Sequence, residues 1–209
     1  WIGSSPCFAE KAGIVYVWLE FGLFRKQWGL VAIHIDSGKI LWKNLNVSSE
    51  MIHASPVINE KIGILACGSN DGIFRAFDMK TWKELWKFQT QAEIKHGAVF
   101  DENRKLVMFG SFDGKFYILK VWDGSEWASF EAWAGFYSSP VINSDNVIIG
   151  SLDKHIYAYD FTQKVMSWKI HTNGRIFSSP LIFENSCYIG SNDGMLYEID
   201  VSTWNPLSL

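Results

Sequence analysis

The stretch Ser138–Ile170, SSPVINSDNVIIGSLDKHIYAYDFTQKVMSWKI, decides the fold of this protein. Its short apolar runs alternate with polar residues and predict four strands joined by tight turns. These strands are expected at Pro140–Asn143, Asn146–Gly150, His155–Tyr159 and Val165–Ile170. The same pattern returns 40 residues later, where SSPLIF begins at Ser178 and CYIGSNDGMLYEID begins at Cys187. A repeat of this length determines the architecture, because one copy cannot bury its apolar faces alone.

Three markers keep this period along the whole chain. The first is an opening motif, in which an apolar residue and a variable residue precede a small residue pair and usually a proline. It ends at Pro6, Pro56, Ala98, Pro140 and Pro180. The second is a Gly-Ser-x-Asp turn, a strong hairpin signal where glycine follows, which begins at Gly68, Gly110, Gly150 and Gly190. The third is a tryptophan, found at Trp42, Trp86, Trp127 and Trp168.

The markers divide the chain into five repeats that we expect to form one domain, residues 1–209. The repeats cover residues 1–50, 51–93, 94–135, 136–175 and 176–209. A four-stranded antiparallel unit of about 40 residues is the size of one β-propeller blade. The predicted fold is therefore an all-β propeller of about five four-stranded blades. In the last repeat Ser208 replaces the recurring tryptophan, so its outer strand is expected to be weak.

The markers resemble the PQQ-like (quinoprotein-type) repeat family of β-propellers. The fourth repeat carries that pattern most completely, in Ser139-Pro140-Val141, Gly150-Ser-Leu-Asp153, Tyr157-Ala158, Asp160 and Trp168. The resemblance implies that the tryptophan docks between adjacent blades, and that the better-known members form rings of seven or eight blades. With five repeats visible, we favour a five-bladed ring. The alternative is an arc of a larger seven- or eight-bladed ring, completed by further blades or by a partner.

Composition argues against several classes of function. The formal net charge is −3, with 19 basic and 22 acidic residues spread evenly, so a basic surface for nucleic acid is not expected. No apolar run reaches the roughly 18 residues of a membrane-spanning helix. The hydrophobic content of 48% is enough for a large core.

The three cysteines, Cys7, Cys67 and Cys187, lie far apart in predicted strands and form no C-x-x-C motif. We therefore expect small buried apolar side chains rather than a disulfide or a metal site. Unpaired cysteines favour a cytoplasmic location, whereas the family resemblance also permits a periplasmic or extracellular one. The sequence leaves the compartment undetermined.

Binding residues are best sought where the repeats differ. The opening motif precedes the strand that we expect to be innermost, so its variable residues should surround one mouth of the central channel. The candidate binding residues there are His53, Lys95, His96, Tyr137 and Phe177. Together they would offer hydrogen-bond donors and aromatic surface to a peptide, a carboxylate or a small polar ligand. The alternative is that some of these rings only fill the channel.

The first repeat carries a second candidate site. Its segment Trp18–Gly29, WLEFGLFRKQWG, replaces the tight Gly-Ser-x-Asp hairpin and is predicted to form a longer loop. Arg25, Lys26 and Trp28 would then be the residues of a binding loop. The alternative is a flap that packs on its neighbour.

Enzymatic alternatives lack the residues that they need. The quinoprotein dehydrogenases that the repeat resembles use PQQ, a calcium ion held by carboxylates and amides, and often two adjacent cysteines. A five-bladed glycoside hydrolase needs two opposed carboxylates, and only Glu50 and Glu93 lie near the opening motifs. His53 and His96 have no third metal ligand. We therefore expect no catalytic residues, no metal and no cofactor, and in particular neither PQQ nor calcium.

The predicted function is a non-catalytic interaction, ligand-sensing or scaffold module that belongs to a larger protein. Its partner is expected to be a protein or a peptide, with a small polar ligand as an alternative. A second copy or further blades would cover the exposed ends of an incomplete ring. The competing prediction is a propeller enzyme of the glycoside hydrolase or quinoprotein type.

Overall fold

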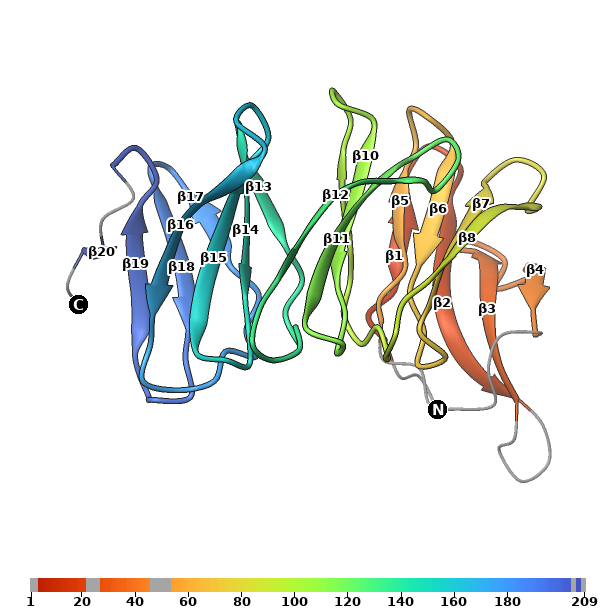
Figure 1. Ribbon diagram of the computed structural model, residues 1–209. Helices are drawn as coiled ribbons and strands as arrows, with labels where there is room; N and C mark the ends of the chain where they lie inside the picture. The colour runs from red at the N-terminus through yellow and green to blue at the C-terminus, as the bar shows by residue number, and fades with distance from the viewer. Residues whose placement is uncertain (1–3, 22–26, 46–53, 204–205, 208–209) are drawn as a thin grey trace.

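The computed structural model describes residues 4–21, 27–45, 54–203 and 206–207. The regular elements of these residues are all β-strands (Figure 1). The strands form five sheets of four, in which they follow one another in chain order. All pairs within the sheets are antiparallel. This is the all-β arrangement of four-stranded blades that the repeats predicted. Within the described residues there is no helix that could cross a membrane.

The twenty strands are as follows. The first sheet holds β1 (Cys7–Ala9), β2 (Ile14–Phe21), β3 (Gln27–His34) and β4 (Ile40–Asn44). The second holds β5 (Val57–Asn59), β6 (Ile64–Cys67), β7 (Ile73–Asp78) and β8 (Glu84–Gln89). The third holds β9 (Val99–Asp101), β10 (Leu106–Gly110), β11 (Lys115–Lys120) and β12 (Glu126–Glu131). The fourth holds β13 (Val141–Asn143), β14 (Asn146–Gly150), β15 (His155–Asp160) and β16 (Val165–His171). The fifth holds β17 (Leu181–Phe183), β18 (Ser186–Gly190), β19 (Leu196–Asp200) and β20 (Pro206–Leu207).

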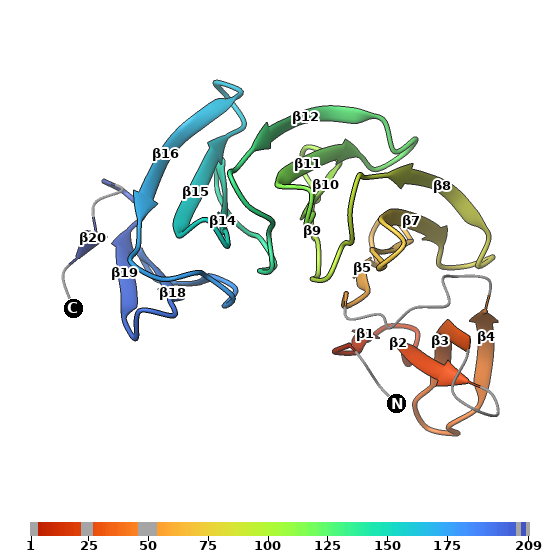
Figure 2. The same cartoon turned by 60° about the horizontal axis from the view of Figure 1, so that its bottom comes forward.

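The sheets are arranged along an arc (Figure 2). Neighbouring sheets contact each other through their first strands, β1 with β5, β5 with β9, β9 with β13 and β13 with β17. The first strand of each sheet is therefore the innermost, as the sequence predicted. The first and the fifth sheet lie at opposite ends of the arc, so the structure corresponds to the alternative of an arc rather than to the closed five-bladed ring that we favoured.

In the third, fourth and fifth sheets, the aspartate of the Gly-Ser-x-Asp turn fixes both its own hairpin and the link from the preceding sheet. The Asp153 carboxylate accepts hydrogen bonds from the His155 amide at 3.0 Å and from the Tyr157 hydroxyl at 2.6 Å. It also accepts one at 3.0 Å from the amide of Trp133, which lies in the link from the third sheet. The same contacts recur at Asp113 and Asp193. This aspartate is therefore structural.

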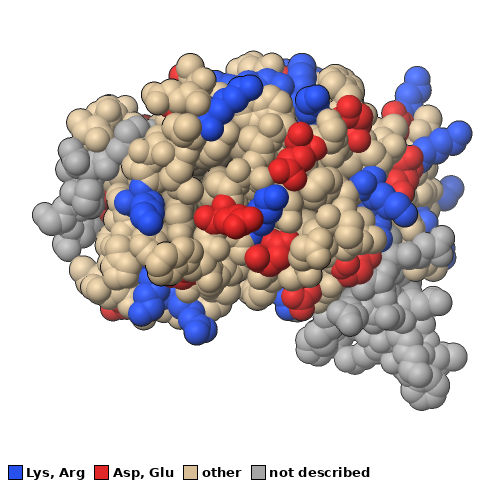
Figure 3. All heavy atoms as spheres, in the orientation of Figure 1, with Lys and Arg blue, Asp and Glu red and all other residues tan. Residues whose placement is uncertain are grey.

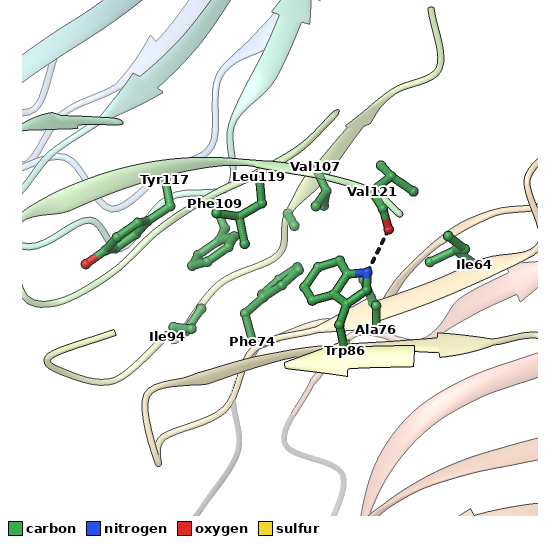
Figure 4. Close-up of a cluster of buried hydrophobic side chains, with 12 residues drawn as sticks. Ile64, Phe74, Ala76, Trp86, Ile94, Val107, Phe109, Tyr117, Leu119 and Val121 are labelled. Atoms are coloured by element: carbon green, nitrogen blue, oxygen red, sulfur yellow. Dashed lines mark hydrogen bonds between the residues drawn. The ribbon is translucent and has the colours of Figure 1, made fainter. Parts of the chain in front are cut away.

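Trp86 docks the second sheet onto the third (Figure 4). Its side chain is 9% exposed, and its indole N–H donates a hydrogen bond of 2.7 Å to the carbonyl oxygen of Val121. Gly124, four residues after the end of β11, has a φ of 69° and leaves room for the ring. A Cβ at Gly124 would lie only 2.6 Å from Cδ2 of the indole. The docking role of this tryptophan is thus confirmed at the interface where it is most buried.

Two of the other docking tryptophans, Trp42 and Trp127, contact the residue that corresponds to Gly124 in the next sheet. This residue again lies four positions after its strand and has a left-handed backbone, with a φ of 56° at Trp82 and 58° at Lys164. The ring of Trp42 stacks on that of Trp82 with centroids 6.3 Å apart. The Nζ atom of Lys164 lies 4.7 Å from the ring centroid of Trp127. The first three sheet interfaces therefore share one geometry and differ in the residue that receives the indole.

The inserted segment of the first repeat differs from its prediction as a loop. Trp18–Phe21 and Gln27–Gly29 belong to strands β2 and β3, which pair from Ile14 with His34 out to Phe21 with Gln27. Trp18 is 0% exposed, so the packing alternative is right for this side chain. The extra residues extend the hairpin because alternating apolar residues continue the strand pattern beyond the usual turn.

Candidate functional site

The structure brings together four of the five residues predicted at the channel mouth. They lie in the links that lead to β9, β13 and β17, and thus come from three sheets. The ring of Tyr137 lies 4.3 Å from that of His96 and 5.3 Å from that of Phe177, centroid to centroid. Lys95 precedes His96 in the first of these links. His53, the fifth predicted residue, lies outside the described residues.

Buried anchors set the position of these side chains. Ile94 and Phe136, which open their motifs, are 0% and 1% exposed. Each anchor occupies space left by the glycine that begins the preceding Gly-Ser-x-Asp turn. A Cβ at Gly68 would lie 2.7 Å from Cβ of Ile94, and one at Gly110 would lie 2.8 Å from Cγ of Phe136. With the anchor fixed in the core, the variable residue after it is held at the mouth.

Phe112 completes the site, and sequence reasoning missed it. Its ring lies 5.7 Å from that of Tyr137, and Nζ of Lys95 lies 5.1 Å from its centroid. The available signal was the variable position of the Gly-Ser-x-Asp turn. The residues there are Asn70, Phe112, Leu152 and Asn192. We call the set of five side chains the mouth cluster: Lys95, His96, Phe112, Tyr137 and Phe177.

The mouth cluster combines one ammonium group with accessible aromatic surface. Nζ of Lys95 lies 3.7 Å from a carboxylate oxygen of Glu93, and the two side chains are 23% and 40% exposed. An ion pair this exposed is weak, so the ammonium group can exchange Glu93 for a ligand. Phe177 is 38% exposed at the edge of the cluster. The arrangement is suited to an anionic group that is flanked by an apolar or aromatic one.

The predicted binding loop of the first repeat is only partly described. Arg25 and Lys26 lie outside the described residues. Trp28 belongs to β3 and pairs with Glu20 of β2, so its backbone is part of a strand rather than of a loop.

The cysteines and Tyr157, which lie outside the mouth cluster, are held in the packed interior of the sheets. Burial raises the pKa of the thiols of Cys7 and Cys187 to about 12, and all three cysteines are free. Burial and a hydrogen bond to Asp153 raise the pKa of Tyr157. Among the described residues no group of three or more His, Cys, Asp or Glu side chains could hold a metal ion. Basic and acidic side chains are interspersed on the face shown in Figure 3.

Comparison with known proteins places the fold. A family model described as "Outer membrane protein assembly factor BamB" matches residues 13–203. The chain belongs to this family of PQQ-like repeats. The crystal structure of BamB from Moraxella catarrhalis matches with a TM-score of 0.79 at 16% identity, over 99% of this chain and 63% of that chain. The computationally designed Ika8 protein matches with a TM-score of 0.75 at 16% identity, over 99% of this chain and 73% of that chain.

The curated relatives match part of the chain, over alignments of 88 and 115 residues in the two examples that follow. The quinoprotein alcohol dehydrogenase PedE of Pseudomonas putida is 34% identical over 88 residues, which are 40% of this chain and 14% of PedE. The beta-alanine-activating enzyme of Danio rerio is 28% identical over 115 residues, which are 52% of this chain and 10% of that enzyme. The chain therefore spans a small part of the length of these relatives.

Proposed function

We propose that this chain is a non-catalytic propeller segment that binds a protein or peptide partner through the mouth cluster. The observation that carries the proposal is the convergence of variable side chains from three sheets into one surface, with Tyr137 in ring contact with His96, Phe112 and Phe177. Repeat scaffolds bind where the copies differ, because the shared positions are occupied by the contacts that hold the blades together.

The chemistry of the cluster favours a linear peptide with an acidic residue next to an apolar or aromatic one. Lys95 provides the positive charge, and its position over Phe112 keeps the ammonium group beside aromatic surface. A carboxylate on the ligand would take the place of Glu93, while an adjacent side chain would pack on Tyr137 and Phe177. The cluster holds several aromatic rings and one cation, the residue types that are enriched at binding hot spots.

The donor set argues against cofactor chemistry at this mouth. Calcium takes six to eight oxygen ligands, whereas the cluster offers an ammonium group, an imidazole and aromatic rings, with Glu93 as the neighbouring carboxylate. These residues therefore do not fit a calcium-dependent quinone site. The family model is named after an assembly factor, whereas the two curated relatives are named as a dehydrogenase and an activating enzyme. A fold that is shared among such different proteins does not define a reaction.

Selection from a random linear peptide library displayed on phage tests the proposal. We expect wild-type protein to enrich peptides with an acidic residue beside an apolar or aromatic one. The double variant Lys95→Ser with His96→Ser should bind these peptides at least about tenfold more weakly while it melts at the wild-type temperature. The matched control, Lys169→Ser with His171→Ser, changes two exposed residues of β16 and should bind normally. Equal affinity of the two double variants would overturn the proposal.

A further inference from the structure

A second site lies between the first and second sheets, where the docking geometry departs from that of its neighbours. Trp82 stands where the third sheet has Gly124. A side chain at that position meets the indole that arrives from the preceding sheet, as the close approach of Gly124 to Trp86 shows. Trp42 therefore stacks on Trp82, with 23° between the ring planes. The pair forms a broad aromatic surface in place of a buried single indole.

This aromatic pair borders a hollow with a volume of about 400 Å³. Phe77 also lines it, with its ring 5.4 Å from that of Trp42. The polar lining consists of Lys43, Asn44 and Glu84. Trp42 and Trp82 are half-buried, and the Glu84 side chain is 39% exposed, so the hollow is accessible from solvent. By contrast, Trp86 is buried at the next interface.

Trp82 has a left-handed backbone, as Lys164 has at the corresponding turn of the fourth sheet. A bulky side chain is strained in the left-handed region, which glycine occupies without strain in the third sheet. Residues held in strained conformations are concentrated at functional sites.

We infer that this hollow binds a neutral sugar ring. The flat indole surface matches the C–H face of a pyranose, which is apolar, while its hydroxyls both donate and accept hydrogen bonds. An ammonium group, an amide and a carboxylate supply the matching donors and acceptors. Lys43 and Glu84 carry opposite charges, so the lining as a whole favours a neutral ligand over an anion or a cation. A hollow of this size that combines aromatic side chains with polar groups can hold a small ligand.

Saturation-transfer NMR with millimolar cellotetraose and maltotetraose tests the inference. At least one of these neutral sugars should give transfer signals with the wild-type chain. The signals should fall at least about tenfold with Trp82→Gly, which removes the ring but suits the left-handed backbone and so should fold. Lys164→Gly is the matched control, because it makes the same change at the corresponding turn of the fourth sheet. It should leave the signals unchanged.

Three outcomes would overturn the inference. One is the absence of transfer to either neutral sugar with folded wild-type protein. Another is transfer that persists in Trp82→Gly, since the sugar would then bind elsewhere. The third is selective transfer to glucuronate or to tetramethylammonium, because a charged ligand would contradict the balanced lining. Far-UV circular dichroism of each variant verifies that a lost signal does not reflect unfolding. The outcome is independent of the mouth cluster, which lies in the links before β9, β13 and β17.

Discussion

Replacing the docking tryptophan Trp86 by alanine should lower the free energy of unfolding by about 4 kcal/mol. The side chain is 9% exposed, so most of a ring surface of about 200 Å² is buried. At about 25 cal/mol per Å² this burial contributes roughly 4–5 kcal/mol as an upper value. The variant also loses the hydrogen bond from the indole to Val121, which is worth about 1 kcal/mol. Partial collapse of the neighbouring side chains offsets some of the loss.

Urea unfolding followed by far-UV circular dichroism measures this change without relying on tryptophan fluorescence. Trp122→Ala is the control, because that ring is 61% exposed and its loss should cost at most about 0.5 kcal/mol. Trp86→Phe should lie between alanine and wild type, since it retains an aromatic ring but no N–H donor. A loss of less than about 1 kcal/mol in Trp86→Ala would refute the docking argument, because burial of this size cannot be recovered by repacking alone.

Two further predictions concern the contacts that hold successive sheets together. Gly110→Ala should destabilise the protein by about 2 kcal/mol, because the added Cβ would meet Phe136 in the core. At Gly190 an added Cβ has room, so Gly190→Ala is the control and should change the urea midpoint little. Equal urea midpoints for the two variants would contradict this. Asp71→Asn should cost about 3 kcal/mol at pH 7, since it removes the closest carboxylate, at 2.7 Å, from the buried guanidinium of Arg75 and leaves that of Glu84 at 3.8 Å. Burial raises the pKa of Asp71, but hydrogen bonds led by that from Arg75 hold the pKa below its usual value. The advantage of wild type should therefore be complete above about pH 4 and decline as the pH falls below it, which urea melts in acid would detect; a difference that stays constant in this range would argue against the ion pair.

The sequence determined the number of sheets and their antiparallel order, and its family resemblance implied the docking of Trp86. These features follow from local patterns, namely period-2 alternation, Asp-Gly turns and a recurring tryptophan, and five copies reinforce each other. It also placed Lys95, His96, Tyr137 and Phe177 on one side of the molecule, because each follows the same buried anchor in its repeat.

Only the tertiary structure decided how these parts meet. The arc replaced the favoured closed ring because the angle between neighbouring sheets depends on the packing of whole faces, which no single motif encodes. The two ends of the inserted segment, Trp18–Phe21 and Gln27–Gly29, form strand rather than loop because they pair with each other. Phe112 joined the mouth cluster, and Trp82 stacked on the docking indole of Trp42, through contacts between residues of different sheets. A repeat fixes what each residue does in its own blade, whereas contacts across blades depend on which side chains the neighbouring copies happen to present.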